Sequence, residues 1–354
     1  MVNKSILFVG YSLQKTYFFE KHCEYLHQNY MCEVEIICLD SDYGASRSGI
    51  KDILVLFFKI FFKVRKINPD LIVSITPKAG LLCGLLSVFL QRVTFVHWFT
   101  GQVWCLDFGA KRLLKKLPDL LTSRLITNIF CDSHPQKRYL LENGFRRVAG
   151  KIKVFGKGSI CGVDCNSIEI LENKMSERLQ LGVVGRINSD KGFTWLLNNF
   201  TNFNHNDDFD LHIFGSVDEP VLDSRFNSFI ESNNNVFYYG EVLNKFDIYN
   251  HFDALISFSY REGFSNVILE AQAYGKPVLA RKIYAIEDTF KDGETGLYWN
   301  DIETLCNGLL KIKDFCNDKT SKKCKSYACD NFNEEKVLMM ICNGYLKLLD
   351  TDNA

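Results

Sequence analysis

Two cations lie close together in a short loop-like segment in the second half of the chain. The apolar run 179–184 predicts a buried strand, and the segment 185–192 (GRINSDKG), which carries Arg186 and Lys191, follows it directly. Gly185 frees the backbone at the strand end, so both cations can project from one loop. Arginine binds two oxygens at once and lysine adds a mobile point charge, which suits a diphosphate at the carboxyl end of a parallel sheet. An ordinary charged surface turn is the alternative.

A second segment, 260–271 (YREGFSNVILEA), follows another predicted strand at 254–258. Gly263, with Ser265 or Asn266 as the N-cap, predicts the start of a helix that Gly275 and Pro277 end. The N-terminus of a helix has free N–H groups and the positive end of the dipole. This segment therefore predicts a second anion-binding element.

Two acids accompany this helix: Glu262 in the loop before it and Glu270 within it. Acids beside a phosphate conflict with charge balance unless each accepts hydrogen bonds from hydroxyl groups. We interpret one as a partner of a sugar ring and the other as a partner of a ribose. The alternative is that Glu262 is an ordinary loop acid and Glu270 a buried partner of an arginine.

These two stretches resemble the retaining nucleotide-sugar glycosyltransferases of family 4, the group 1 transferases with the GT-B fold. The resemblance rests on Gly-Arg-x4-Lys-Gly and Glu-x7-Glu, with further similarity at 214–215, 239–242 and 275–278. It implies that Arg186 and Lys191 bind the donor diphosphate and stabilise the departing nucleotide. It also implies that Glu262 contacts the transferred sugar and Glu270 the ribose.

The same resemblance implies that the backbone after Glu262 holds phosphate and sugar, and that loops near Gly215 and Val242 hold the base. The predicted donor-binding residues are therefore Gly185, Gly215, Val242, Gly263, Phe264, Ser265, Asn266, Val267 and Glu270.

The first half resembles the family through 76–80 (TPKAG) and 96–104 (VHWFTGQVW), which look like a subgroup that builds bacterial surface polysaccharides such as O-antigen and capsule. The resemblance makes His97 the candidate contact to the donor sugar, and a structural histidine at a strand end is the alternative. Many members carry a Gly-Gly loop after the first strand. Here Gly10-Tyr11-Ser12 replaces it, so the way in which the acceptor is held near Gly10 differs from the family pattern.

Apolar runs alternate with segments of helical period in both halves, which predicts parallel sheets with helices on both faces. The expected fold is α/β, a GT-B architecture of two Rossmann-like domains facing a cleft. We expect an acceptor-binding domain at 1–150, a glycine-rich crossover at 151–178 and a nucleotide-sugar-binding domain at 179–335. A last helix, 336–354, is expected to pack back across the interface.

The net charge is zero, yet residues 1–165 hold 23 Lys/Arg against 13 Asp/Glu, whereas residues 166–354 hold 19 against 29. The first half is therefore about +10 and predicts an anionic partner. Nucleic acid is not expected, because no zinc-finger, RNP or basic-zipper pattern occurs. The basic, apolar segments 51–66 and 111–116 suggest contact with anionic lipid and a lipid-diphosphate-linked glycan. The alternative for 51–66 is a helix packed on the sheet with only its charged stripe in water.

Thirteen cysteines occur without a CxxC pair, which favours buried, reduced thiols in a cytosolic protein. We find neither a signal peptide nor an apolar run long enough to span a membrane, so we expect a cytoplasmic protein, peripheral at most at the inner face of the membrane. Asp40-Ser41-Asp42 has the Asp-x-Asp form that binds metal in other glycosyltransferases. We nevertheless expect no metal and no cofactor, because Arg186 and Lys191 can neutralise the leaving group.

The sequence thus predicts a retaining, metal-independent hexosyltransferase. By resemblance, the donor is a UDP-linked hexose or N-acetylhexosamine and the acceptor a glycan, expected to be linked to a lipid diphosphate. Two alternatives stay open: a sugar-nucleotide epimerase of the same fold, and a non-catalytic scaffold of a polysaccharide assembly complex.

Overall fold

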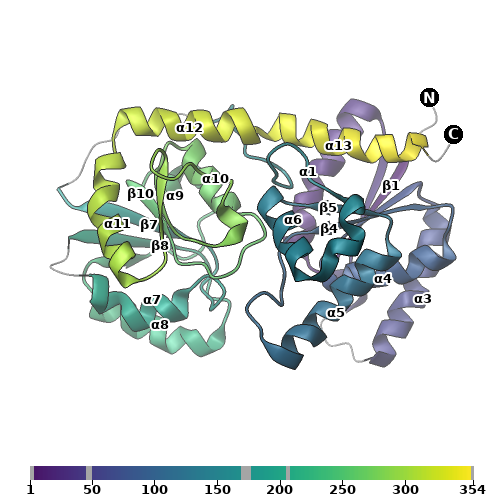
Figure 1. Cartoon of the computed structure of the whole chain (residues 1–354), viewed down its shortest axis with the longest axis horizontal. Coiled ribbons are helices and arrows are strands. Elements are labelled where there is room, and N and C mark those ends of the chain that lie inside the picture. The colour runs from purple at the N-terminus through teal and green to yellow at the C-terminus, as the bar shows by residue number, and fades with distance from the viewer. Residues whose placement is uncertain (1–3, 45–49, 169–176, 205–207, 352–354) are drawn as a thin grey trace. The chain divides into compact units, whose positions relative to one another are not determined.

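The computed structural model describes residues 4–44, 50–168, 177–204 and 208–351. The chain forms two compact units, one of Met1–Gly162 with Glu334–Ala354 (unit 1) and one of Val163–Asn333 (unit 2). Each unit holds a six-stranded parallel sheet with helices on both faces, which confirms the predicted α/β class (Figure 1). Of the predicted crossover and last helix, residues 169–176 and 352–354 lie outside the described residues.

The sheet of unit 1 has the strand order β2-β1-β3-β4-β5-β6. Its strands are β1 (Ser5–Gly10), β2 (Glu33–Cys38), β3 (Leu71–Ile75), β4 (Thr94–Phe99), β5 (Asn128–Cys131) and β6 (Ile152–Lys153). Its helices are α1 (Leu13–Tyr30), α2 (Leu39–Tyr43), α3 (Ile50–Ile67), α4 (Pro77–Phe89), α5 (Gly109–Leu125), α6 (His134–Leu140) and α13 (Glu334–Thr351).

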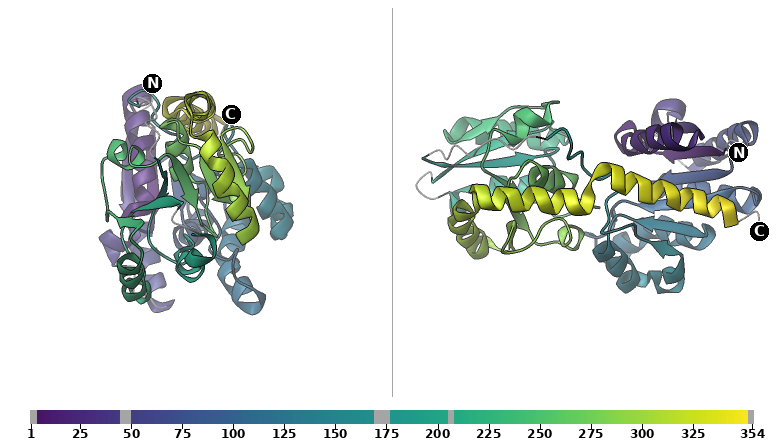
Figure 2. Two further views of the ribbon diagram at one scale, coloured as in Figure 1. Left: turned by 90° about the vertical axis from the view of Figure 1, so that its left-hand side faces the viewer. Right: turned by 90° about the horizontal axis from the view of Figure 1, so that it is seen from above.

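Helices α1 and α13 lie side by side on one face of this sheet, and α3, α4 and α5 lie on the other (Figures 1 and 2). His22 links α1 to α13, because its Nδ1 lies 3.1 Å from the Tyr345 hydroxyl of α13. Its Nε2 lies 2.6 Å from the Ile160 carbonyl. Burial lowers the pKa of His22 to about 4, so the imidazole is neutral near pH 7. The last helix is therefore part of the core of unit 1.

The sheet of unit 2 has the order β12-β11-β10-β7-β8-β9. Its strands are β7 (Leu179–Val184), β8 (Phe209–Phe214), β9 (Val236–Tyr238), β10 (Ala254–Ser257), β11 (Val278–Arg281) and β12 (Gly296–Trp299). Its helices are α7 (Phe193–Phe203), α8 (Pro220–Ser232), α9 (Lys245–Tyr249), α10 (Asn266–Ala273), α11 (Ile302–Phe315) and α12 (Asp318–Phe332). Phenylalanines from α7, α8 and β8 dominate the core on one side of this sheet.

Two expectations from the sequence need correction. The thiols were all expected to be reduced, whereas Cys165 and Cys329 form a disulfide within unit 2, tying the start of the unit to α12. For α3, the alternative of a helix that leaves only its charged stripe in water is wrong, whereas its contact with a membrane stays a prediction. The helix packs on the sheet through Ile60 and Val64, yet its outer side also exposes Phe58 and Phe62. Over the described parts of the chain, no helix is long and apolar enough to cross a membrane.

Candidate functional site

The strand order of unit 2 reverses between β7 and β10, which are neighbours in the middle of the sheet. From β7 the chain moves outward through β8 and β9, and from β10 it moves the other way through β11 and β12. Connections that leave in opposite directions open a crevice at the carboxyl ends of the two strands, where open α/β sheets bind their ligands. The predicted cation loop follows β7 and the predicted acid loop follows β10.

The loop after β7 approaches the loop after β10 so closely that a glycine is required. Gly192 has φ = +82°, and a Cβ there would lie 2.1 Å from the carbonyl oxygen of Phe258. The Tyr260 N–H donates to the Asp190 carbonyl at 2.9 Å, and the side chains of Arg261 and Asp190 form an ion pair. The two loops therefore hold one another in place before any ligand arrives.

Lys191 and Glu262 meet in this contact. The Lys191 Nζ lies 2.6 Å from Glu262 Oε1, and the side chains are only 20% and 11% exposed. The Asn188 side chain accepts the backbone N–H of Lys191 at 3.0 Å, which fixes the turn that carries the lysine. The structure thus brings together two residues that are 71 positions apart in the sequence. A shielded cation and a carboxylate beside it form a centre for a polar ligand with both negative charge and hydroxyl groups.

Arg186 is held differently. Its Nη1 donates to Asp218 Oδ2 at 2.7 Å, and the two side chains are 43% and 41% exposed. An ion pair this exposed contributes at most about 1 kcal/mol, so an incoming anion can recruit the guanidinium at little cost. The structure therefore places Arg186 on the loop after β7, as predicted, with an acidic partner that the sequence did not reveal.

The second acid of the motif, Glu270 in α10, lies between two partners. Lys245 Nζ is 2.7 Å from Glu270 Oε1, and the Tyr249 hydroxyl donates to Oε2 at 2.8 Å. Burial, and next the Glu270 carboxylate, raise the pKa of Tyr249 well above its usual range, so its hydroxyl keeps the proton that it donates. The alternative of a buried arginine partner is wrong, because lysine and tyrosine take that place.

The predicted base-binding loops meet the cation loop through their backbones. Gly215 has φ = +139°, and a Cβ there would lie 2.0 Å from the carbonyl oxygen of Gly185. Its N–H donates to the carbonyl of Gly240 at 2.7 Å. Val242, two residues after Gly240, is half-buried against the apolar cluster around Phe214 and Tyr249. Glycines at the ends of β7 and β8 therefore let three loops pack together with little side-chain bulk between them.

The N-terminus of α10 completes the crevice. Phe264 and Ser265 are buried, and Gly263 and Val267 lie on either side of them at half-buried positions. Ser265 is the N-cap residue but makes no side-chain capping hydrogen bond. A helix start without a capping side chain keeps donors for an anion. Asn266 Oδ1 is also buried, and no described residue hydrogen-bonds to it.

His97, the candidate in unit 1, is 1% exposed. Its Nδ1 lies 2.9 Å from the Ser74 hydroxyl of the neighbouring strand, and its ring packs against Phe99. Burial lowers the pKa of His97 to about 3, so the ring is neutral near pH 7 and does not act as an imidazolium acid. Its contact with a donor sugar stays a prediction.

The Asp40-Ser41-Asp42 triplet forms part of the short helix α2. Asp42 Oδ2 accepts the backbone N–H of Cys38 at 2.9 Å, so this carboxylate holds the end of β2. Within the described residues, no cluster of three His, Cys, Asp or Glu side chains has the arrangement of a metal site.

Sequence reasoning missed Arg281, the last residue of β11. Its guanidinium carbon lies 4.8, 4.3 and 4.1 Å from the ring centroids of Trp195, Tyr260 and Trp299, and its Nε donates to the Phe258 carbonyl at 3.3 Å. Arg281 thus anchors the loop that carries Glu262. The one available signal is an arginine at the end of a predicted strand, which says nothing about its three aromatic partners.

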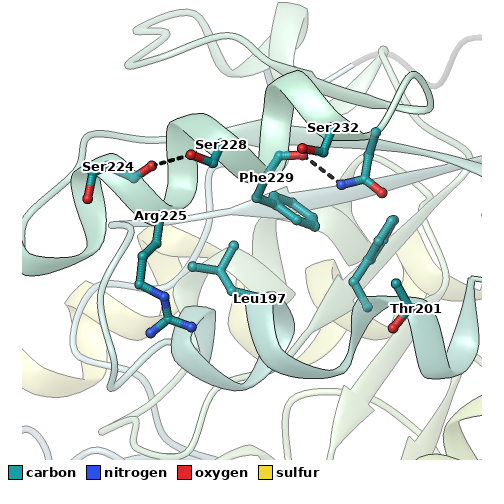
Figure 3. A pocket seen from close by; sticks show the side chains of 9 residues that line it. Leu197, Thr201, Ser224, Arg225, Ser228, Phe229 and Ser232 are labelled. Carbon is teal, nitrogen blue, oxygen red and sulfur yellow. Dashed lines mark hydrogen bonds between the residues drawn. The ribbon is translucent and has the colours of Figure 1, made fainter.

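Unit 2 also has a hollow away from the crevice, with a volume of about 460 Å³, between α7 and α8 (Figure 3). Its cation, Arg225, donates to the Asn198 side chain at 2.6 Å, and its lining contains neither a carboxylate nor a lysine. The hollow therefore lacks the combination of charges found at the β7–β10 crevice, and we place the candidate site at the crevice.

Known proteins match both the sequence and the fold. Residues 178–314 match the family model described as "Glycosyl transferases group 1". The capsular polysaccharide biosynthesis glycosyltransferase CapM of Staphylococcus aureus is 27% identical over 288 residues, which cover 78% of this chain and 74% of that protein. An uncharacterized 41.2 kDa protein in the cps region of Klebsiella pneumoniae is 29% identical over 336 residues, covering 89% and 88%.

The structure resembles that of HepE from Anabaena in complex with UDP-glucose, with a TM-score of 0.75, 17% identity and coverage of 97% of this chain and 99% of that one. It also resembles the apo form of the lipopolysaccharide outer core galactosyltransferase WaaB, with a TM-score of 0.73, 15% identity and coverage of 97% and 99%. These similarities establish the GT-B fold. The part of the chain that carries the Lys191–Glu262 crevice, residues 178–314, thus matches the group 1 glycosyl transferases in sequence.

Proposed function

We propose that this protein transfers a hexose or N-acetylhexosamine, with retention of configuration, from a UDP-linked donor to a lipid-diphosphate-linked glycan during surface-polysaccharide assembly. The similarity to CapM supports the type of product, and the UDP and UDP-glucose complexes of HepE support the donor. The observation that carries the proposal is the shielded Lys191–Glu262 pair at the strand reversal of unit 2.

In this proposal Lys191 and Arg186 bind the donor diphosphate, and both leave carboxylate partners to do so. Charge that develops on the departing diphosphate is then stabilised by these two cations. Glu262, released from Lys191, accepts hydrogen bonds from the transferred sugar, while Glu270 accepts those of the ribose. Because these cations neutralise the leaving group, the reaction proceeds without a metal ion.

A thermal-shift screen of UDP-, GDP- and dTDP-sugars in EDTA tests the donor site. A ligand present at about 100 times its Kd stabilises the folded state by about 2.7 kcal/mol, which raises Tm by a few degrees. We expect UDP-sugars to stabilise the wild type and Arg225→Ala, whose cation lines the other hollow, but not Lys191→Ala. Stabilisation of Lys191→Ala equal to that of the wild type would remove the lysine from the donor site.

Product analysis then separates the proposal from its alternatives. A transferase releases UDP only when an acceptor receives the sugar, whereas an epimerase converts the donor alone and a scaffold binds it without turnover. Loss of turnover in EDTA that manganese restores would contradict the metal-independent mechanism.

A further inference from the structure

Two helices of unit 1 expose large apolar side chains at the same spacing. In α3 they are Leu54, Val55, Phe58 and Phe62, and in α5 they are Leu113, Leu114, Leu117 and Leu121. Positions i, i+1, i+4 and i+8 lie on one stripe of a helix. The opposite side of α3 already packs on the sheet through Ile60 and Val64. Core formation therefore does not explain the outer stripes.

Helix α4 lies between α3 and α5. It contacts both α3 and α5, and all three helices cover the same face of the sheet (Figure 1). Phe89 of α4 is exposed, and its ring lies 5.8 Å from that of Phe57 in α3. We call the outward sides of α3, α4 and α5 the outer helical face. Monomeric proteins rarely expose this many large apolar side chains on neighbouring helices unless they bind something.

The outer helical face belongs to a strongly basic part of the chain. Residues 50–125 contain 12 Lys/Arg and four Asp/Glu. Of these acids, Asp119 is buried, and Asp107 is held by Lys111 at 3.0 Å and Lys115 at 2.7 Å. Lys59 and Lys66, two turns apart on α3, are exposed beside its apolar stripe. Lysine and arginine reach past apolar side chains with their own methylene stems, so cations beside such a stripe suit an interface with anionic head groups.

We propose that the outer helical face docks on the surface of an anionic lipid bilayer. The leucine and phenylalanine side chains enter the boundary between head groups and acyl chains, and the cations contact lipid phosphates. A second copy of the chain is a poorer occupant, because it would bring one basic face against another. This inference concerns unit 1 alone and does not rest on the donor site of unit 2.

Vesicle co-sedimentation of the full chain at low salt tests this proposal. We expect binding to phosphatidylcholine vesicles that contain phosphatidylglycerol, and far weaker binding to phosphatidylcholine alone. Leu113→Ser combined with Leu114→Ser should lower the partition coefficient at least about tenfold, through loss of buried apolar area. Lys59→Gln and Lys66→Gln should each lower it about fivefold, with the effect fading as salt is added.

Leu310→Ser is the matched control, because Leu310 on α11 of unit 2 is 74% exposed and Leu114 is 73% exposed. Its vesicle binding should equal that of the wild type, and the Tm of each variant shows whether it folds. No binding to anionic vesicles, or an equal loss in Leu310→Ser, would overturn the proposal. So would leucine variants that change only the oligomeric state, since the face would then join copies of the chain. Vesicle binding needs no nucleotide sugar, so its failure leaves the donor-site proposal standing.

Discussion

The two units share an architecture but place different chemistry where their strand order reverses. In unit 2 the reversal lies between β7 and β10, and the loops there meet through ion pairs, Lys191–Glu262 and Arg261–Asp190. In unit 1 it lies between β1 and β3, where Lys78 at the start of α4 donates to the Tyr11 hydroxyl at 3.1 Å. The buried neutral pair Ser74 and His97 lies beside it, within β3 and β4. The same kind of sheet can therefore carry ion pairs at its reversal in one unit and a lysine on a tyrosine in the other, because the segments that follow the strands supply the charged groups.

Unit 1 also carries backbone strain where unit 2 uses glycine. Thr76 follows β3 with φ = +81° and ψ = 150°, a region that β-branched residues rarely occupy. In unit 2 the loops after β7 and β8 place glycines, Gly185 and Gly215, at positive φ. Strain of this kind persists only where the surrounding structure enforces it. The structure around Thr76 therefore enforces an unfavourable backbone conformation at the strand reversal of unit 1, although the side chains there differ from those of unit 2.

The largest expected effect comes from breaking the Lys191–Glu262 ion pair of unit 2. Lys191→Ala and Glu262→Ala should each lower turnover by about two orders of magnitude or more, since each removes a group from the reacting centre. Turnover is measured as UDP release in the presence of an acceptor, and circular dichroism checks the fold. Arg225→Ala, outside the crevice, should retain wild-type turnover. Near-normal activity of Lys191→Ala would move the chemistry away from this ion pair.

The second prediction concerns a carboxyl group that unit 1 buries without a cation. Asp119 accepts the Trp104 indole N–H at 2.7 Å, and burial raises the pKa of Asp119 to about 7. The folded protein keeps a proton that the unfolded chain releases near pH 4, so stability falls as pH rises from about 4 to about 7. Between about pH 5 and about pH 7, the wild type should lose about 2 kcal/mol relative to Asp119→Asn.

Urea unfolding of both proteins across this pH range measures that difference. Parallel stability profiles would show that Asp119 does not titrate in this window. A profile that rises with pH in the wild type alone would reverse the sign and indicate that Asp119 is stabilised as a carboxylate.

Arg281 differs from the other cations near the crevice of unit 2, because its partners are aromatic rings and not an acid. Arg281→Met should cost about 1–2 kcal/mol of stability, through loss of the contacts with Trp195, Tyr260 and Trp299. It should also lower kcat several-fold with little change in donor KM, since the Glu262 loop loses its anchor. Arg281→Lys should recover part of the lost stability and part of the lost kcat. A loss of stability with unchanged kcat would limit Arg281 to a structural role.

The smallest effect relieves the strain in unit 1. Thr76→Gly should raise the free energy of unfolding by up to about 1 kcal/mol, because glycine adopts this conformation without strain. Thr76→Ser is the matched control, since serine keeps the hydroxyl and also the strain at Cβ. If Thr76→Gly instead destabilises the protein, the threonine side chain contributes more to stability than its strained backbone conformation costs.

Local pattern predicted the strands well. The predicted strands at 179–184 and 254–258 match β7 and β10, because strands buried on both faces appear as continuous apolar runs. Helices α5, α8 and α12 were missed. Pro118 and a basic run inside α5 argue against a helix there, and α12 is mostly polar, so its helical period is weak.

The sequence by itself determined the strand–helix alternation, the cation loop after β7 and the acid motif before and within α10. These are local features, because apolar runs, caps and glycine turns act over a few residues. Only the tertiary structure decided the rest: that β10 lies beside β7, that Lys191 meets Glu262, and that Arg281 lies among three rings. Strands of a parallel sheet carry the same apolar signal whichever neighbour they pair with, so contacts between loops far apart in the chain are fixed only once the strands are ordered.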